Sequence, residues 1–308
     1  LGHNNGVCLG VTIRKKSFLT LSSIAYLSKA SMFGGAMPKD FSRRQFLGFA
    51  ASSAAVVGLG LVGCGSSASS SSNSSDSNST SFSKSSYIVA TDTTFAPFEF
   101  TNDSNEFVGI DVDLLSSIAS DTGFSYDLQS LGFDAAVAAL ESGQADAVIA
   151  GMSITDARKE KYDFSDPYYD SYVCMAVKSG SDITGYSDLS GKTVAAKTGT
   201  QGATCAESLK DQYGFSITYF DESSMMYQDV LTGNSVSCFE DYPVMAYGIS
   251  QGNGLEIITE EKEDYSTPYG FAVMKGQNSD LLDAFNKGLS DLKDNGGYDD
   301  IINKYLQS

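Results

Sequence analysis

The sequence has no tryptophan and a single histidine, His3, and only one of its four arginines, Arg158, lies beyond residue 86. Without another histidine, the chain cannot build a Ser/His/Asp or Cys/His triad, an imidazole acid or base, or a histidine-bearing zinc site. Most hydrolase mechanisms are thereby excluded. We expect no catalytic residues, no metal and no cofactor.

Cysteine is also sparse, with five residues and no CxxC spacing, and a chain of this length does not need disulfides to fold. Cys174 and Cys238 lie in apolar runs that are typical of strands, so we interpret both as small core residues. A Cys205–Cys238 bridge stays open as an alternative in an exported protein.

Basic side chains are outnumbered by acidic ones, 20 to 38, which gives a formal net charge of −18. Residues 87–308 carry 12 basic and 36 acidic side chains, a net charge of −24. Proteins that bind nucleic acid neutralise phosphates with lysine and arginine, so this balance excludes a nucleic-acid partner. The 308 residues allow one large domain or two of ordinary size.

A basic start followed by an uncharged run of small and apolar residues occupies residues 37–64 and predicts an export signal. Residues 42–47 (SRRQFL) resemble the twin-arginine translocation motif, and residues 61–64 (LVGC) resemble a lipobox that would be lipidated at Cys64. The alternative is a transmembrane helix over residues 45–63, for which the glycine, serine and alanine content is poor. We therefore expect an exported protein that a lipid anchors to the outer face of the cytoplasmic membrane.

The segments on either side of this signal have different characters. Residues 1–36 begin with leucine, and we interpret them as upstream sequence, with translation starting at Met37 or Met32. Residues 65–86 are mostly serine with some asparagine and predict a flexible, solvated tether. A globular part is then expected from residue 87 onward.

Short runs typical of strands alternate from residue 87 with stretches whose apolar residues recur at helical spacing. This alternation predicts an α/β fold with largely parallel pairing. The expected strands are 87–90, 124–131, 146–151, 172–177, 193–197, 216–220, 235–239 and 255–259, and the expected helices are 111–123, 133–144, 204–214, 224–234 and 242–251.

A faint internal repeat joins two of these segments. Residues 138–151 and 228–241 each contain a helix end, a glycine suited to end that helix (Gly143 or Gly233), and then a buried strand. The repeat predicts two similar α/β lobes. Because ligands bind beyond the carboxyl ends of strands in open α/β sheets, we expect a site in the cleft between the lobes.

Several motifs, in order along the chain, resemble the extracellular solute-binding proteins of polar amino-acid ABC transporters. They include ATDTTFAPFEF (90–100), GIDVDLLSSIA (109–119), AGMSITDARKEKYDFSDPYY (150–169), KTVAAKTGT (192–200) and YGFAVMKG (269–276). The resemblance implies a two-lobed periplasmic-binding-protein fold with mixed, mostly parallel sheets. It places lobe 1 at residues 87–171 plus 268–308 and lobe 2 at residues 172–267, with hinge crossings near residues 168–173 and 266–270.

Arg158 follows Ser153 in a turn between a strand and a helix, where its planar fork of donors suits a ligand carboxylate, with help from the Ser153 hydroxyl. The alternative is a solvated residue beside Lys159 and Lys161. The turn at residues 198–200 opens a helix whose N–H groups favour an anion. The resemblance implies that Thr200 completes the α-carboxylate site from the second lobe, although the same sequence also suits an ordinary turn.

The resemblance further implies that Asp241 pairs with the ligand α-ammonium, with the Gly151 carbonyl as a second acceptor. The alternative for Asp241 is an N-cap of the helix that starts near Pro243. Phe95 and Phe133 correspond to rings that hold the apolar stem of the ligand, although Phe133 also suits the core of its own helix.

Asp92, Lys197 and Glu240 would line the far end of the pocket. Asp92 and Lys197 match glutamine-binding members of the family, but Glu240 stands where those proteins have histidine. Two acids and one lysine can hold an amide, whereas an arginine or lysine ligand would bring a cation for the extra acid. We rank glutamine first and basic amino acids second, with glutamate well behind.

The resemblance thus implies a binding protein that closes around a polar amino acid and delivers it to a membrane permease, and together with the predicted lipid anchor we expect a monomer held at the membrane. A lyase or dehydratase on the same fold is the enzymatic alternative, with Glu240, Asp92 and Lys197 as its only plausible acid groups. A surface adhesin or a receptor's ligand module is a third alternative.

Overall fold

The computed structural model describes residues 81–306, except for the side chains of residues 262–264. The predicted export signal, the lipidation site Cys64 and residues 65–80 of the predicted tether lie outside this range. Within residues 81–306, no helix is both long enough and apolar enough to cross a membrane.

Strands and helices alternate through most of this range, as the sequence predicts, and two helices end it. The strands are β1 (Tyr87–Thr91), β2 (Phe100–Thr101), β3 (Phe107–Val108), β4 (Tyr126–Ser130), β5 (Ala147–Val148), β6 (Tyr162–Phe164), β7 (Tyr172–Lys178), β8 (Thr193–Lys197), β9 (Ser216–Phe220), β10 (Ser237–Asp241), β11 (Leu255–Ser266) and β12 (Ala272–Met274). The helices are α1 (Ile110–Thr122), α2 (Phe133–Glu141), α3 (Asp156–Lys159), α4 (Gln201–Tyr213), α5 (Ser223–Thr232), α6 (Tyr242–Ser250), α7 (Ser279–Asn295) and α8 (Gly297–Leu306).

Two five-stranded sheets form the two lobes, in the orders β4-β1-β5-β12-β6 and β11-β7-β10-β8-β9. Each sheet has a parallel half, β4-β1-β5 or β10-β8-β9, and an antiparallel half. The expectation of mixed sheets is confirmed, but the antiparallel share is larger than the strand-helix alternation predicts. The reason is that β6, β7, β11 and β12 flank the crossings between lobes, where the chain reverses direction.

The internal repeat corresponds to a shared βαβαβ unit, β1-α1-β4-α2-β5 in one lobe and β8-α4-β9-α5-β10 in the other. The helix-to-strand joints of the two units are similar, but the cap of α2 is Ser142, one residue before the predicted Gly143. Gly233 ends α5 in the left-handed conformation, with φ 83°, and Gly143 follows the α2 cap with φ 73°. Glycine adopts this conformation without steric cost.

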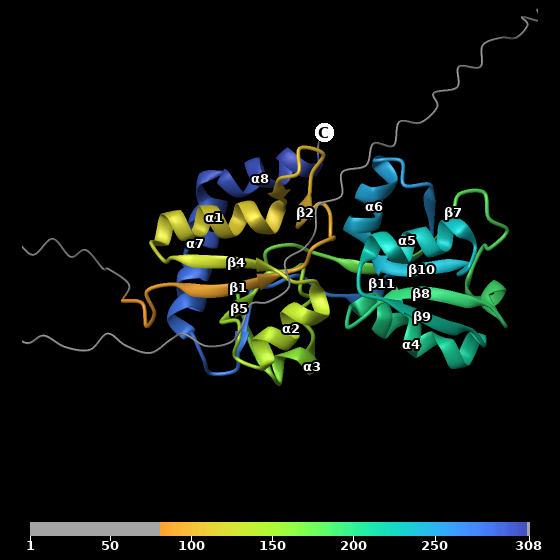
Figure 1. The fold of residues 1–308 in the computed structure, drawn as a ribbon, viewed down its shortest axis with the longest axis horizontal. Helices are drawn as coiled ribbons and strands as arrows, with labels where there is room; N and C mark the ends of the chain where they lie inside the picture. Colours follow the sequence, from red (N-terminus) through yellow and green to blue (C-terminus); the bar gives the residue numbers. More distant parts are fainter. Residues whose placement is uncertain (1–80, 307–308) are drawn as a thin grey trace, which may run out of the picture. The chain divides into compact units, whose positions relative to one another are not determined.

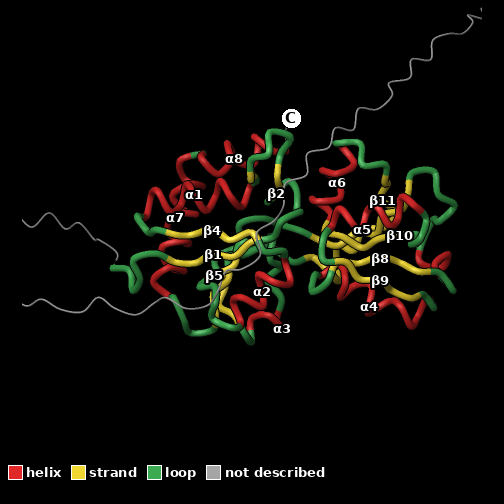
Figure 2. Tube along the Cα trace, in the orientation of Figure 1, coloured by secondary structure: helices red, strands yellow, loops and turns green. Residues whose placement is uncertain are grey.

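Helices cover both faces of each sheet (Figures 1 and 2). In one lobe, α1 and α7 lie on one face of the sheet and α2 lies on the other. In the second lobe, α4 lies on one face and α5 and α6 lie on the other. Neighbouring strand residues therefore enter different cores. Val89 packs with α1 and α7, whereas Ala90 packs with α2. In the other lobe, Cys174 and Cys238 pack under α5, and Cys205 lies on the α4 side. All three are buried thiols, as expected for Cys174 and Cys238, and the Cys205–Cys238 bridge is not formed.

The two crossings run beside each other. The backbone N–H of Tyr168 donates to the Tyr269 carbonyl (3.0 Å), the Tyr269 N–H donates to Tyr169 (2.7 Å), and Thr267 donates to Ser171 (2.9 Å). We propose the lobe boundaries at residues 171/172 and 267/268, as the sequence predicts, because the sheet membership changes across these crossings.

The last residues of the predicted tether (65–86) already make contacts with the first lobe. Phe82 is half-buried and packs edge-on against the rings of Tyr87 and Phe124, and the Ser83 N–H donates to the Asp280 carboxylate. An aromatic residue within a serine-rich segment is the signal that marks this boundary.

Candidate functional site

The predicted ligand residues gather where the parallel strands of both lobes end. Asp92 directly follows β1, Gly151 follows β5, Lys197 ends β8 and Asp241 ends β10. This is the edge at which open α/β sheets bind ligands. Eight of the ten predicted residues line one cavity of about 10 Å³, and the complete lining is Asp92, Phe95, Phe133, Ala150, Gly151, Ser153, Arg158, Thr200, Gln201 and Asp241.

Arg158 points away from its exposed neighbours and toward the other lobe. One guanidinium nitrogen donates to the Ser153 carbonyl (2.9 Å), and the other donates to the Gly199 carbonyl (3.0 Å). Burial lowers the pKa of Arg158, and the charge of Asp241 opposes that shift. Lys159, by contrast, is exposed and pairs with Asp156. The alternative of a solvated Arg158 therefore does not describe the structure.

Asp241 occupies the N-cap position of α6, but its side chain makes no capping hydrogen bond. Its Oδ2 accepts instead from the Tyr269 hydroxyl at 2.6 Å. Burial, with repulsion from Glu240, raises the pKa of Asp241 to about 7, while Tyr269, Arg158 and Lys197 pull it down. The geometry thus favours a buried acceptor over the capping alternative.

Each of the two predicted stem-holding rings lies against a cation. The Arg158 guanidinium carbon is 5.3 Å from the centre of the Phe133 ring, and Lys197 Nζ is 5.3 Å from the centre of the Phe95 ring. Both phenylalanines are buried and line the same cavity. Cations over aromatic faces are attracted by the ring quadrupole, so these contacts fix the rings and the cations together.

Lys197 and Glu240 lie behind the cavity and do not line it, which differs from the prediction. Lys197 is fully buried and pairs with Asp92 of the other lobe. Glu240 Oε2 accepts from the hydroxyls of Ser223 and Tyr227, both at 2.9 Å, and Lys197 Nζ is 3.4 Å from the Ser223 hydroxyl. The three predicted polar groups are brought together, with Ser223 between the cation and the second acid.

Thr200 occupies a position that is compatible with both alternatives left open by the sequence. It is the N-cap of α4, where its hydroxyl accepts from the Ala203 N–H at 3.2 Å and donates to the Lys197 carbonyl at 2.8 Å. It also lines the cavity. The hydroxyl is therefore engaged in building the start of α4, and the helix terminus itself faces the site.

The sequence did not predict three residues whose hydroxyl groups donate hydrogen bonds to the predicted site carboxylates. Tyr269 stands in the second crossing and orients Asp241, while Ser223 and Tyr227 on α5 orient Glu240. The motif around Tyr269 indicated its importance, but nothing in the sequence connected it to Asp241. Gln201 and Ala150 also line the cavity without having been predicted.

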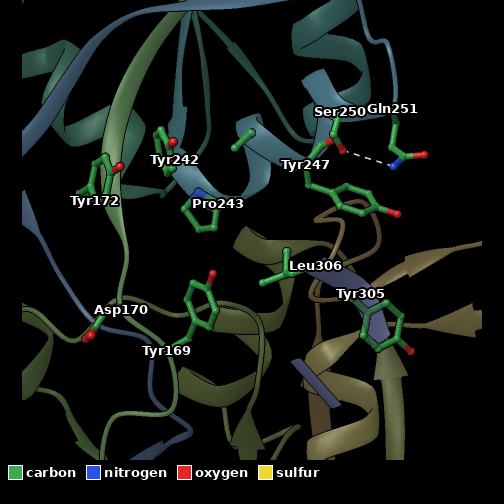
Figure 3. A pocket seen from close by; sticks show the side chains of 11 residues that line it. Tyr169, Asp170, Tyr172, Tyr242, Pro243, Tyr247, Ser250, Gln251, Tyr305 and Leu306 are labelled. Atoms are coloured by element: carbon green, nitrogen blue, oxygen red, sulfur yellow. Dashed lines mark hydrogen bonds between the residues drawn. The ribbon is translucent and has the colours of Figure 1, made fainter. Parts of the chain in front are cut away.

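A larger cavity of about 370 Å³ lies against α6 and the end of α8, where tyrosines dominate the lining (Figure 3). Asp170 is the one charged residue among those that line it. No lysine or arginine lines this larger cavity, whereas the smaller cavity is lined by both Arg158 and Asp241, which makes it the candidate ligand site.

Two α/β lobes, two adjoining crossings and a polar cavity at the strand ends define a solute-binding protein of the periplasmic-binding-protein type. Residues 87–308 match the bacterial extracellular solute-binding proteins, family 3, and the chain belongs to this family. The family and the fold class that the sequence predicted are thereby confirmed.

Three relatives illustrate the similarity. The arginine-binding extracellular protein ArtP of Bacillus subtilis is 31% identical over 72% of this chain and 87% of its own length. The second substrate-binding domain of Lactococcus lactis GlnP, in an open conformation, is 42% identical with a TM-score of 0.51, over 73% and 97% of the two chains. An ancestral arginine-binding protein, solved with arginine and with glutamine, is 36% identical with a TM-score of 0.66, over 72–73% of this chain and 99% of its own.

Proposed function

We propose that this protein captures a polar L-amino acid in the cavity between its lobes and delivers it to the permease of an ABC importer. One observation carries the proposal: a half-buried guanidinium and a buried carboxylate, Arg158 and Asp241, line the same small cavity. An L-amino acid presents the complementary pair, an α-carboxylate and an α-ammonium.

The remaining residues take positions suited to such a ligand. Ser153 and the start of α4 at Thr200 assist Arg158 at the carboxylate, and the Gly151 carbonyl assists Asp241 at the ammonium. Phe95 and Phe133 hold the apolar stem. The contacts come from both lobes, so the ligand favours the closed arrangement and shifts the population toward it.

Opening of the lobes is part of this mechanism. The enclosed space of about 10 Å³ is roughly that of one water molecule. An amino acid therefore enters only when the contacts between the lobes, such as Arg158 to Gly199 and Lys197 to Asp92, have parted. The better superposition with the arginine-bound ancestral protein than with the open GlnP domain supports a closed arrangement here.

Glutamine is the ligand that we propose first. Lys197 can donate to the amide oxygen, and the carboxylates of Asp92 and Glu240 can accept from the amide nitrogen. The ancestral arginine-binding relative was solved with glutamine as well as with arginine, so it supports both this choice and the next. Arginine or lysine is the second candidate, favoured by one observation: Lys197 pairs with Asp92, which leaves Glu240 held by the neutral hydroxyls of Ser223 and Tyr227.

The test is calorimetric titration of the full chain, stripped of ligand by unfolding and refolding, with glutamine, arginine, lysine, histidine, glutamate and cystine. We expect glutamine to bind with the lowest Kd. In Glu240→Gln, we expect the ratio of the arginine Kd to the glutamine Kd to rise about tenfold or more, because loss of a buried charge weakens a cation more than an amide.

Glu256→Gln, a substitution in the same lobe outside the site, serves as the control and should leave that ratio unchanged. Tighter binding of arginine than of glutamine by the unaltered protein would replace the first candidate with the second. Absence of heat with every amino acid would contradict the proposed function itself.

We propose that the protein acts as a monomer and as a binding protein without enzymatic activity. All three relatives described above are named as binding proteins or substrate-binding domains, which supports this proposal over the lyase or dehydratase alternative. The permease would dock the closed, ligand-bound form, and ATP hydrolysis elsewhere in the importer would drive uptake.

We also propose that Cys64 carries the lipid that holds the protein at the membrane. The family of extracellular solute-binding proteins is consistent with export. In a bacterial host that processes lipoproteins, we expect radiolabelled palmitate to label the wild type but not Cys64→Ser, because serine has no thiol that could carry the lipid. Ser67→Ala, which leaves Cys64 in place, is the matched control, and equal labelling of Cys64→Ser and the wild type would contradict lipidation at this residue.

A further inference from the structure

Two carboxyl groups lie buried behind the ligand cavity, and neither is among the proposed ligand contacts. Glu99 precedes β2, and Asp111 lies in the first turn of α1, and both are fully buried. Among the side chains that the structure describes, neither forms an ion pair with a lysine or arginine. Two buried carboxylates without a cation would repel each other at high cost.

Of the four carboxyl oxygens of Glu99 and Asp111, only one accepts hydrogen bonds from other described groups. Asp111 Oδ2 accepts from the Gly151 N–H and from the Tyr168 hydroxyl, both at 2.8 Å. Asp111 Oδ1 and both carboxyl oxygens of Glu99 are shielded from water and receive no hydrogen from any other described group. The backbone brings the two residues into the same buried space, because the Asp111 N–H donates to the carbonyl of Phe98, the residue before Glu99, at 2.9 Å. One additional proton between them would satisfy an oxygen on each side.

We propose that Glu99 is protonated in the folded protein and donates its proton to Asp111 Oδ1, so that an acid–carboxylate pair fixes the Gly151 backbone from behind the cavity. Burial, together with the charges of Asp111 and Asp92, raises the pKa of Glu99 well above its ordinary value, and Lys197 opposes this only partly. The pKa of Asp111 rises less, to about 6, because Gly151, Tyr168 and Glu99 all donate to it. The proton therefore resides on Glu99.

The pair holds a glycine that no other residue can replace without strain. Gly151 has φ 52°, and a Cβ atom there would lie 2.4 Å from Cε1 of Phe95. Its N–H is anchored to Asp111, so its carbonyl, on the other side of the same residue, keeps a fixed direction. This step rests on the proposed function, in which that carbonyl accepts from the ligand ammonium.

The same pair reaches the crossing between the lobes. Tyr168, the second donor to Asp111, lies in the first crossing, and its N–H bonds to Tyr269 of the second crossing. Glu99 also pairs through its backbone with Phe95, whose ring lines the cavity. Glu99 is thus a positioning residue that connects the Gly151 loop, the Phe95 ring and the hinge without touching the ligand.

The test compares the pH dependence of stability in the full chain and in Glu99→Gln. Glutamine can donate the same hydrogen bond to Asp111 but carries no titratable proton. Because the pKa of Glu99 is raised on folding, the folded state binds more protons than the unfolded state, and the stabilisation is lost as pH rises above the unfolded value near 4.5. The ratio of the unfolding constant of the wild type to that of Glu99→Gln should rise about tenfold per pH unit between pH 5 and 7.

Denaturant unfolding at pH 5, 6 and 7 gives this ratio, and groups elsewhere affect both proteins alike. Glu160→Gln, at an exposed position, should unfold with the same pH dependence as the wild type. Parallel profiles for Glu99→Gln and the wild type would overturn the proposal, because they would show that Glu99 is ionised in the folded protein.

A second measurement needs no variant and covers the case in which Glu99→Gln fails to fold. Infrared spectra of the wild type at neutral pH, with and without carbon-13 in its glutamate residues, should show the carbonyl stretch of a protonated carboxylic acid among the label-shifted bands. Absence of that band would overturn the proposal. Ligand titration of the same samples separates the two hypotheses: a protonated Glu99 in a protein that binds no amino acid would contradict only the proposed function.

Discussion

Asp241→Asn is expected to raise the Kd for the amino-acid ligand by roughly a hundredfold or more. The substitution leaves the ligand ammonium buried against a neutral amide, and removal of one partner from a buried ion pair costs about 3 to 5 kcal/mol. The Tyr269 hydroxyl can still donate to the amide oxygen, so the crossing keeps its hydrogen bond. Calorimetric titration at pH 8 measures the change.

The pH profile of binding provides an internal control for this assignment. The pKa of Asp241 is about 7, and only its ionised form pairs with an ammonium group. As pH falls below 7, the wild-type Kd should therefore rise by up to tenfold per unit, while the Asp241→Asn Kd should stay nearly constant over the same range. Asp211→Asn, at an exposed position on α4, should behave like the wild type. An Asp241→Asn protein with wild-type affinity at pH 8 would remove Asp241 from the site.

Arg158→Ala is expected to weaken binding by about tenfold to a hundredfold, and by more if the ligand carboxylate stays buried without a partner. A hydrogen bond to a charged group contributes roughly 1.5 to 3 kcal/mol, and Arg158 is the only arginine in residues 87–308. Its two present acceptors are carbonyl oxygens on the Ser153 and Gly199 sides of the cavity. Titration with the ligand that binds the wild type most tightly gives the measurement.

Lys159→Ala is the matched control, because Lys159 is the next residue of α3 but is exposed and pairs with Asp156. We expect its Kd to equal that of the wild type. Equal effects of the two substitutions would point to a general loss of positive charge, and an unchanged Kd in Arg158→Ala would contradict its proposed role.

The sequence predicted the order of strands and helices well from residue 124 to residue 259, because central strands such as β7, β8 and β10 are apolar and buried and most helices there carry apolar residues at regular spacing. Gly233 marks a helix end, and β10 follows it as predicted. The prediction missed the helices α3, α7 and α8 and the two-residue strands β2 and β3, and it also missed β6 and β12. The strands β6 and β12 have three residues each and are held by antiparallel partners from distant parts of the chain, which leaves no local periodicity to detect.

The residues of the candidate site were predicted largely through the family resemblance. The contacts that hold these residues in place were not predicted. Arg158 is conspicuous as a lone arginine, but the sequence does not show that its donors reach Gly199, 41 residues away. Lys197 and Asp92 are 105 residues apart, and their pairing depends on contact between two sheets. Glu99 and Asp111 stand in quoted motifs, yet only the fold shows that they share one buried space.

The ion pair between Lys197 and Asp92 has a consequence for how quickly the ligand can be released. Parting the lobes returns both charges to water, and the recovered hydration offsets most of the lost attraction. The pair therefore aligns the lobes when they meet but adds little to the lifetime of the closed state. Dwell times in that state should then follow the ligand's own contacts, so a weakly held amino acid would leave quickly even though a salt bridge covers it.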